Sequence, residues 1–215
     1  MKLLLTSAGF TNKSIAKACE ELTGKPLKKL KLAFVPTAAN VEEGDKDWLI
    51  NDLYRTRKLF KEVDIIDISA VGKEIWEPRL RGADVLMFGG GNSFHLMNCL
   101  EKSGLKDLLP ELLKTKVYVG ISAGSICCGP SLKSLKSWYY PDLEDEKGDI
   151  ALKFVNFHFR PHLNSKWFPK VREEILEEFA KEFPEPFYAL DDQSAIKVDG
   201  EKVTIVSEGV WKKFN

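Results

Sequence analysis

The sequence predicts an α/β fold in which helices cover both faces of a parallel sheet, with a small antiparallel extension at the C-terminal end. Short apolar segments alternate with amphipathic ones through the first two thirds of the chain, a pattern typical of parallel sheets. Near the end, two β-rich segments flank Asp199-Gly200, a pair that favours a hairpin turn. No linker-like stretch divides the 215 residues, so we expect a single domain over residues 1–215.

Five segments are expected to be strands of the buried sheet, because β-branched and large apolar residues follow one another almost without interruption. These are residues 2–5, 30–35, 63–68, 85–88 and 117–121. Between them apolar side chains recur at helical spacing, and one helix is closed by a glycine. Helices are therefore expected over residues 14–22, 42–61, 75–80, 93–100 and 105–113.

The regular alternation loosens beyond Pro130. Residues 131–148 are expected to form a surface loop, whose aromatic segment 138–140 packs against the protein or lines a cleft. Residues 154–159 alternate as a strand does, and residues 166–182 show the apolar spacing of an amphipathic helix.

Composition excludes several functions. Thirty-two basic and thirty-two acidic side chains cancel, which argues against a nucleic-acid partner or an anionic membrane surface. No apolar run approaches the roughly 20 residues of a membrane span, and the Leu3-Leu4-Leu5 run is too short for a signal peptide. The four cysteines lack metal-ligand spacing and are expected to be reduced thiols of a cytoplasmic protein. We expect no metal and no cofactor; a monomer and a homodimer both remain open.

The segment Gly120-Ile-Ser-Ala-Gly124 has the G-x-S-x-G spacing of a nucleophile elbow. It follows a buried strand and precedes small residues that suit the start of a helix. A serine on such a sharp turn needs nearly bare neighbours two residues away on each side, because the backbone there is strained. The pattern predicts Ser122 as a nucleophile, whereas the alternative is an ordinary serine in a tight turn.

A glycine run, Gly89-Gly90-Gly91, ends the fourth strand and is followed by Asn92. Ligands of parallel α/β sheets bind beyond the carboxyl ends of the strands, so this loop should lie near the elbow. The run matches neither the Walker pattern nor G-x-G-x-x-G. We expect the amide of Gly91 to pair with that of Ala123 as an oxyanion hole; the alternative is a turn before a helix capped by Asn92.

Three histidines are available as the base that a serine nucleophile needs. His162 follows Arg160-Pro161 at a strand end and is well placed to overhang a cleft, so we favour it. His158 is the next choice, although its position between two phenylalanines favours a structural role, and His95 lies in a helix. The carboxylate that orients the base is expected among Asp191 and Asp192, both of which could instead cap a turn.

These motifs carry a resemblance. Phe88-Gly-Gly-Gly-Asn-Ser-Phe94, the elbow and Arg160-Pro-His-Leu163 together resemble the S51 peptidase family, which includes aspartyl dipeptidases and, more distantly, cyanophycinase. The likeness extends from Leu3 to the C-terminal hairpin. It implies a flavodoxin-like fold close to class I glutamine amidotransferases, with serine where those enzymes carry cysteine. It also implies small peptides as substrates.

The resemblance assigns roles by position. It implies Ser122 as nucleophile, His162 as base, and Gly91 and Ala123 as oxyanion donors. The third member falls on Asp192, an aspartate where the family carries a glutamate. A different assignment uses an aspartate in the loop after the elbow, where Asp142 is the nearest one here.

Substrate recognition is implied for two further residues. Asn92 lies in the shared glycine-run motif, and Arg172 is the one arginine retained from the charged run that would bind an N-terminal aspartate. The alternative for Arg172 is a solvated side chain on a highly charged helix. The predicted function is a serine exopeptidase that hydrolyses short peptides, with dipeptides as the main substrates. A preference for N-terminal aspartate is the narrower expectation. The rival hypotheses are an esterase or amidase with the same triad, and a catalytically idle α/β binding protein.

Overall fold

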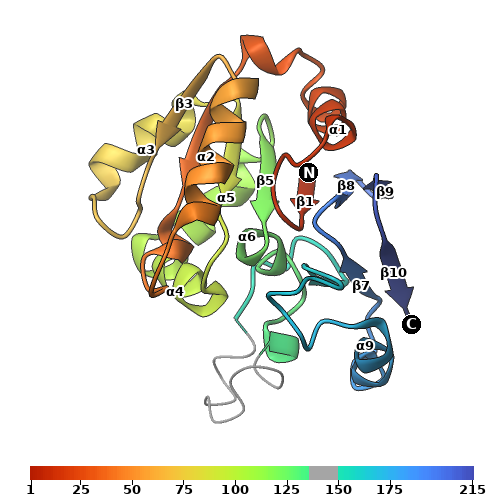
Figure 1. The fold of residues 1–215 in the computed structure, drawn as a ribbon. Helices are drawn as coiled ribbons and strands as arrows, with labels where there is room; N and C mark the ends of the chain where they lie inside the picture. The colour runs from red at the N-terminus through yellow and green to blue at the C-terminus, as the bar shows by residue number, and fades with distance from the viewer. Residues whose placement is uncertain (136–149) are drawn as a thin grey trace.

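A computed structural model describes residues 1–135 and 150–215 (Figure 1). A seven-stranded sheet has the order β3-β2-β4-β5-β1-β8-β9, in which the first five strands are parallel and the last two antiparallel. Its strands are β1 (Lys2–Thr6), β2 (Lys31–Val35), β3 (Glu62–Ile65), β4 (Val85–Phe88), β5 (Val117–Ile121), β8 (Ser194–Asp199) and β9 (Lys202–Ser207). The predicted α/β class and its antiparallel C-terminal extension are confirmed.

Helices cover both faces of this sheet. The bounds are α1 (Lys13–Thr23), α2 (Asp47–Leu59), α3 (Lys73–Gly82), α4 (Ser93–Ser103), α5 (Leu105–Leu112) and α6 (Ala123–Ile126), with short 3₁₀ turns η1 (Leu27–Lys29) and η2 (Thr37–Ala39). Apolar side chains of α1 and α2 pack on one face, and those of α3, α4, α5 and α6 pack on the other. In Figure 1, α2 crosses in front of the sheet beside β5.

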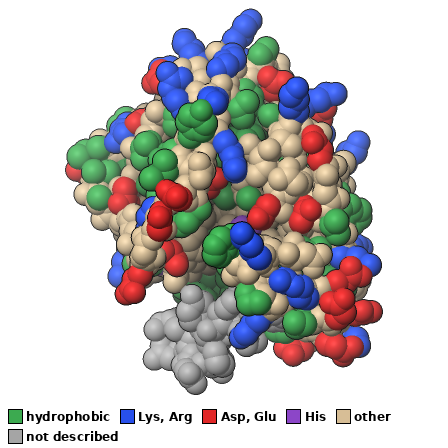
Figure 2. Space-filling view, in the orientation of Figure 1, with side chains coloured by type: hydrophobic (Ala, Val, Ile, Leu, Met, Phe, Trp, Pro, Cys, Tyr) green, Lys and Arg blue, Asp and Glu red, His purple; other side chains and the backbone are tan. Residues whose placement is uncertain are grey.

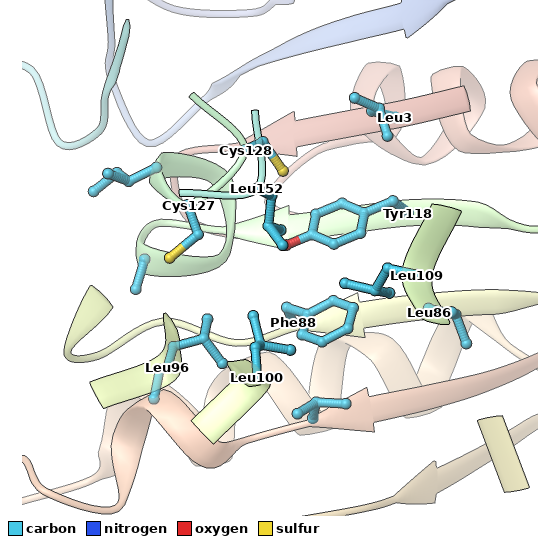
Figure 3. Close-up of a cluster of buried hydrophobic side chains, with 14 of the residues drawn as sticks. Leu3, Leu86, Phe88, Leu96, Leu100, Leu109, Tyr118, Cys127, Cys128 and Leu152 are labelled. Carbon is cyan, nitrogen blue, oxygen red and sulfur yellow. The ribbon is translucent and has the colours of Figure 1, made fainter. Parts of the chain in front are cut away.

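The strand sequences explain why both faces are covered. Side chains alternate between the two faces of a strand, so an apolar run without polar interruptions must bury both. In β1, Leu3 and Leu5 join one core, whereas Leu4 joins the other. Figure 3 shows the first of these cores, in which the rings of Phe88 and Tyr118 stack with centroids 4.8 Å apart. The Tyr118 hydroxyl donates to the carbonyl of Gly124, which ties this core to the turn after β5.

A second sheet of three strands, in the order β10-β7-β6, lies beside the first toward the C-terminus (Figure 1). Its strands are β6 (His158–Arg160), β7 (Phe187–Leu190) and β10 (Trp211–Phe214), and it packs against α9 (Glu173–Ala180). Two predictions were too long here. The expected strand over residues 154–159 is reduced to β6, and the expected helix over residues 166–182 begins only after the loop that contains Pro169.

The expected surface loop over residues 131–148 is only partly described. Leu132 and Leu135 are buried in the core, so this first part is no simple surface loop. The remainder, including the aromatic segment 138–140 and Asp142, lies outside the described residues. Within the described part of the chain, no helix is long and apolar enough to cross a membrane.

The turn after β5 depends on two close backbone contacts. A β-carbon at Gly120 would lie 2.6 Å from the amide nitrogen of Ser125, and one at Gly124 would lie 2.2 Å from the carbonyl oxygen of Phe88. Both distances are far below van der Waals contact, and the neighbouring atoms are backbone. The glycines of the G-x-S-x-G pattern are therefore required by the approach of α6 to β4 and β5.

We expect Gly124→Ala to destabilise the fold by about 3 kcal/mol or more, because the strand it would strike cannot move without breaking the sheet. Chemical denaturation measures the change. Gly82→Ala in α3 is the matched control, since its β-carbon would meet nothing within 4 Å. That control should leave stability equal or raise it by up to about 1 kcal/mol. Equal stability of both variants would contradict the steric argument.

Candidate active site

Ser122 lies at the carboxyl end of β5, directly before α6. Its backbone has φ 46° and ψ −104°, a region that residues with a side chain rarely adopt. Hydrogen bonds to the end of β1 hold this turn: the Ser122 amide donates to the carbonyl of Thr6 (3.1 Å), and the Ser125 hydroxyl donates to the same oxygen (2.9 Å). The strain at Ser122 is thus supported by the neighbouring strand.

His162 and Asp192 come from loops that follow β6 and β7. The structure places His162 Nε2 3.1 Å from Ser122 Oγ and His162 Nδ1 2.6 Å from Asp192 Oδ1. The three residues that the sequence analysis selected therefore form one hydrogen-bonded chain. In that chain a histidine can accept the serine proton at one nitrogen while a carboxylate holds the other.

Ser7, at the end of β1, connects the members of this chain and was missed by the sequence analysis. Its hydroxyl donates to Asp192 Oδ1 (2.9 Å) and accepts a hydrogen bond from the backbone amide of His162 (2.9 Å). The one available sequence signal was position, since Ser7 directly follows β1, the strand that pairs in parallel with β5. Ser7 fixes the His162 loop and the carboxylate at once.

The Asp192 carboxyl is held in its ionised form. Burial alone would raise its pKa, but hydrogen bonds from His162 and Ser7 and the positive charges of His162 and Arg55 lower it below the ordinary value. A carboxylate that stays charged can stabilise the imidazolium that forms when His162 takes a proton.

Asp191 has a different role from its neighbour. Its Oδ1 accepts hydrogen bonds from the Gln193 amide (3.0 Å) and the Ser194 hydroxyl (2.6 Å), and its Oδ2 accepts one from the Val210 amide (2.7 Å). These bonds join the turn before β8 to the turn before β10. Of the two adjacent aspartates, only Asp192 contacts His162 in the structure.

The amide groups of Gly91 and Ala123 are free to act as donors. Among the described residues, neither N–H donates to a protein acceptor. Ala123 begins α6 directly after Ser122, and the Gly90 position beside Gly91 borders the serine: a β-carbon there would lie 3.5 Å from Ser122 Cβ. Unpaired amides beside a serine are what an oxyanion hole requires.

The two other histidines contact different groups. His158 is buried, lies 3.4 Å from Glu185 through Nε2 and packs on Phe183 and Phe187. Burial lowers its pKa, against the pull of the Glu185 charge, so a structural role fits it. His95 Nε2 lies 3.5 Å from the Cys99 sulfur on the same helix.

Asn92 and Arg172 are both engaged in local structure. The Asn92 side-chain oxygen accepts a hydrogen bond from the His95 amide (2.9 Å) and caps α4, as the sequence suggested. Arg172 Nη1 donates to three backbone carbonyls, those of Ser165, Phe168 and Val171. The guanidinium therefore organises the loop between His162 and α9.

Two partly exposed aromatic side chains lie near Ser122 and His162. The ring of Phe168 stacks on His162 with centroids 4.4 Å apart and planes 7° apart. A β-carbon at Gly90 would lie 3.5 Å from the Trp48 ring and 3.5 Å from Ser122 Cβ, so both residues border this position. Figure 2 shows that acidic, basic and hydrophobic side chains are interspersed over the face seen in the orientation of Figure 1. Within the described residues, no group of three or more His, Cys, Asp or Glu side chains could hold a metal ion.

Comparison with related sequences identifies the family of this chain. The model of Peptidase family S51 matches residues 3–206. A peptidase E of Streptomyces coelicolor is 30% identical over 215 residues, which cover 96% of this chain and 83% of the relative. An uncharacterized peptidase of Listeria innocua is 26% identical over 185 residues, covering 83% of this chain and 85% of the relative.

Two solved structures of peptidases are similar to this chain. A 1.5 Å crystal structure of a candidate peptidase E protein from Listeria monocytogenes EGD-e has a TM-score of 0.78 and 26% identity, covering 97% of this chain and 98% of that one. A peptidase from an acI-B1 actinobacterium has a TM-score of 0.70 at 17% identity, covering 99% of this chain and 93% of that one, and shows the fold alone. This chain therefore belongs to peptidase family S51 and is a serine-type peptidase.

Proposed function

We propose that this peptidase is an exopeptidase that hydrolyses short peptides, dipeptides above all, through Ser122, His162 and Asp192. The observation that carries the proposal is the unbroken hydrogen-bonded chain from Ser122 Oγ through the His162 ring to Asp192 Oδ1. The dipeptide preference is carried over from the family resemblance and from relatives named peptidase E.

In the proposed reaction, Ser122 Oγ attacks the scissile carbonyl carbon while His162 Nε2 takes the hydroxyl proton. The resulting oxyanion receives hydrogen bonds from the amides of Gly91 and Ala123, and the ionised Asp192 stabilises the imidazolium. His162 then protonates the leaving amine, which departs with the C-terminal residue. Water hydrolyses the acyl-enzyme by the same steps, with His162 again acting first as base and then as acid.

A preference for N-terminal aspartate stays a prediction. It would need a cation that is free to bind the substrate's side chain, whereas Arg172 Nη1 is bonded to backbone carbonyls. The remaining guanidinium nitrogens would have to supply the contact.

A fluorophosphonate probe and a dipeptide panel test the proposal. We expect the probe to label Ser122, since only an activated serine reacts well, and the panel to show release of single amino acids. The panel varies the N-terminal residue and includes aspartate, so it also measures any preference for that residue. Simple esters serve as the comparison: turnover of esters without any dipeptide would indicate an esterase, and no labelling at all would indicate an idle site.

A further inference from the structure

One face of α2 carries side chains to the catalytic residues. Trp48, Asp52 and Arg55 are spaced four and three residues apart, so they project from the same side of the helix. Trp48 borders the Gly90 position that Ser122 also borders, as described above. One turn further on, Asp52 borders the corresponding position at Gly9.

The Asp52 carboxylate lies against the loop that supports Asp192. A β-carbon at Gly9 would lie 3.4 Å from Asp52 Oδ1 and 3.2 Å from the Cδ1 atom of Ile121, the residue before Ser122. Gly9 is two residues beyond Ser7, whose hydroxyl binds Asp192. Asp52 and Ile121, the residue preceding the nucleophile, thus both border Gly9 in the loop that begins at Ser7.

This carboxylate is mostly buried but keeps some solvent access. Asp52 is 7% exposed, and among the described residues no N–H or O–H lies within hydrogen-bond distance of its side-chain oxygens. The nearest cation is Arg55 Nη1 at 3.8 Å, beyond hydrogen-bond distance. Burial raises the pKa of Asp52 to about 7, Arg55 opposes the rise, and the charge of Asp192 adds to it. A carboxylate that has little solvent contact and no protein donor, yet stays accessible, is open to a donor that arrives with a ligand.

Asp52 borders the same glycine as the residue before Ser122, and this location limits what that donor can be. In a peptide whose first bond is cleaved, the α-ammonium nitrogen lies about 2.5 Å from the carbonyl carbon that the serine attacks. A group that binds this ammonium must therefore lie beside the nucleophile. Two neighbouring carboxylates, Asp52 and Asp192, make this side of the site attractive to a cation, and Asp192 Oδ1 already accepts two hydrogen bonds.

We propose that Asp52 binds the free α-ammonium group of the substrate's N-terminal residue and so selects peptides with an unblocked amino terminus. The inference rests on the proposed exopeptidase function and names the group that would enforce it. Trp48, one turn earlier on the same face, covers the first residue of the substrate.

The first test compares a cleaved dipeptide with its N-acetyl form. In the wild type we expect a strong preference for the free amine. In Asp52→Asn, kcat/KM for the free dipeptide should fall about 30-fold or more, mostly through KM, and the preference over the acetylated form should collapse toward one. Asp47→Asn removes the same charge from an exposed position of α2 and should keep the preference. An unchanged preference in Asp52→Asn, or an equal fall for both substrates, would overturn the proposal.

A binding measurement separates this inference from the catalytic one. The Ser122→Ala protein should bind the free dipeptide more tightly than its acetylated form in calorimetry, and Ser122→Ala with Asp52→Asn should not distinguish them. If that difference appears while the wild type cleaves no dipeptide, the recognition stands and the proposed function fails. If Ser122→Ala binds both forms equally while the wild type cleaves dipeptides, the recognition is wrong and the function stands.

A stability measurement checks the unpaired state of the carboxyl. Asp52 faces Arg55 on its own helix and Asp192, which is bonded to His162, across the site. Because its folded pKa is raised from 3.8 to about 7, the folded chain binds more protons than the unfolded chain between these values. Its contribution to stability is therefore lost as pH rises through this window. The Tm of Asp52→Asn relative to the wild type should rise between pH 5 and pH 8; a constant difference would mean that the carboxyl is already paired.

Discussion

Replacing Ser122 with alanine is expected to lower kcat/KM on a cleaved dipeptide about 10⁴-fold or more while leaving the fold intact. The change removes only the Oγ atom that lies 3.1 Å from His162 Nε2. The hydrogen bonds that hold the turn, from the Ser122 amide and the Ser125 hydroxyl to the Thr6 carbonyl, do not involve that atom. Steady-state kinetics measures the loss, and fluorophosphonate labelling should disappear with it.

Ser103→Ala is the control for this substitution. Ser103 lies at the end of α4, and within residues 1–135 and 150–215 its hydroxyl bonds only to nearby backbone groups, so its loss should leave kcat/KM and labelling within about twofold. Both proteins should melt close to the wild-type temperature. Near-native turnover in Ser122→Ala would end the serine mechanism altogether.

The second large effect is expected from Asp192→Asn, with a loss of about 10³- to 10⁴-fold in kcat. An asparagine keeps the shape but can present its N–H₂ to His162 Nδ1, which would favour the tautomer with its proton facing Ser122. That histidine cannot accept the serine proton. The loss in kcat should be smaller at higher pH, where hydroxide can take the serine proton in place of His162. A pH–rate profile measures this dependence.

Asp191→Asn is the matched comparison, because the two aspartates are adjacent and differ only in their partners. The Asp191 carboxylate accepts three hydrogen bonds that join two turns, so its substitution should cost about 1–3 kcal/mol of stability. Below its melting temperature the variant should keep most of its activity. If Asp191→Asn is the one that loses turnover, the assignment of Asp192 is off by one residue.

The fold was predictable because its strands are apolar on both faces and its turns depend on glycine. Leu3, Leu4 and Leu5 alternate between two cores, which the unbroken apolar run of β1 required. The elbow followed from steric need, since Gly124 leaves no room for a side chain. The expected helix over residues 166–182 failed at its start, where Arg172 holds the loop around Pro169 by bonding to its carbonyls.

The candidate site was predictable only where motifs marked it. Ser122 has its glycine spacing, and His162 stands beside a proline at a strand end. Ser7 and Asp52 belong to no motif: a lone serine after a strand and an aspartate within a helix are both ordinary in sequence. Phe168 lies in the loop before α9, and its ring stacks on His162. The spacing of apolar residues predicts helices and could not reveal this contact. Such partners are selected by tertiary packing rather than by local pattern.

The hydrogen-bonded chain also joins the two sheets. Ser122 and Ser7 follow strands of the seven-stranded sheet, whereas His162 and Asp192 follow β6 and β7 of the three-stranded one. The smaller sheet has a core of its own and is completed by β10 at the very end of the chain. Since small peripheral cores open at lower free energy than central ones, this unit should detach first on heating. Turnover would then vanish at a temperature where the helical circular dichroism of the larger layer is still intact, making catalysis a reporter of sub-global unfolding.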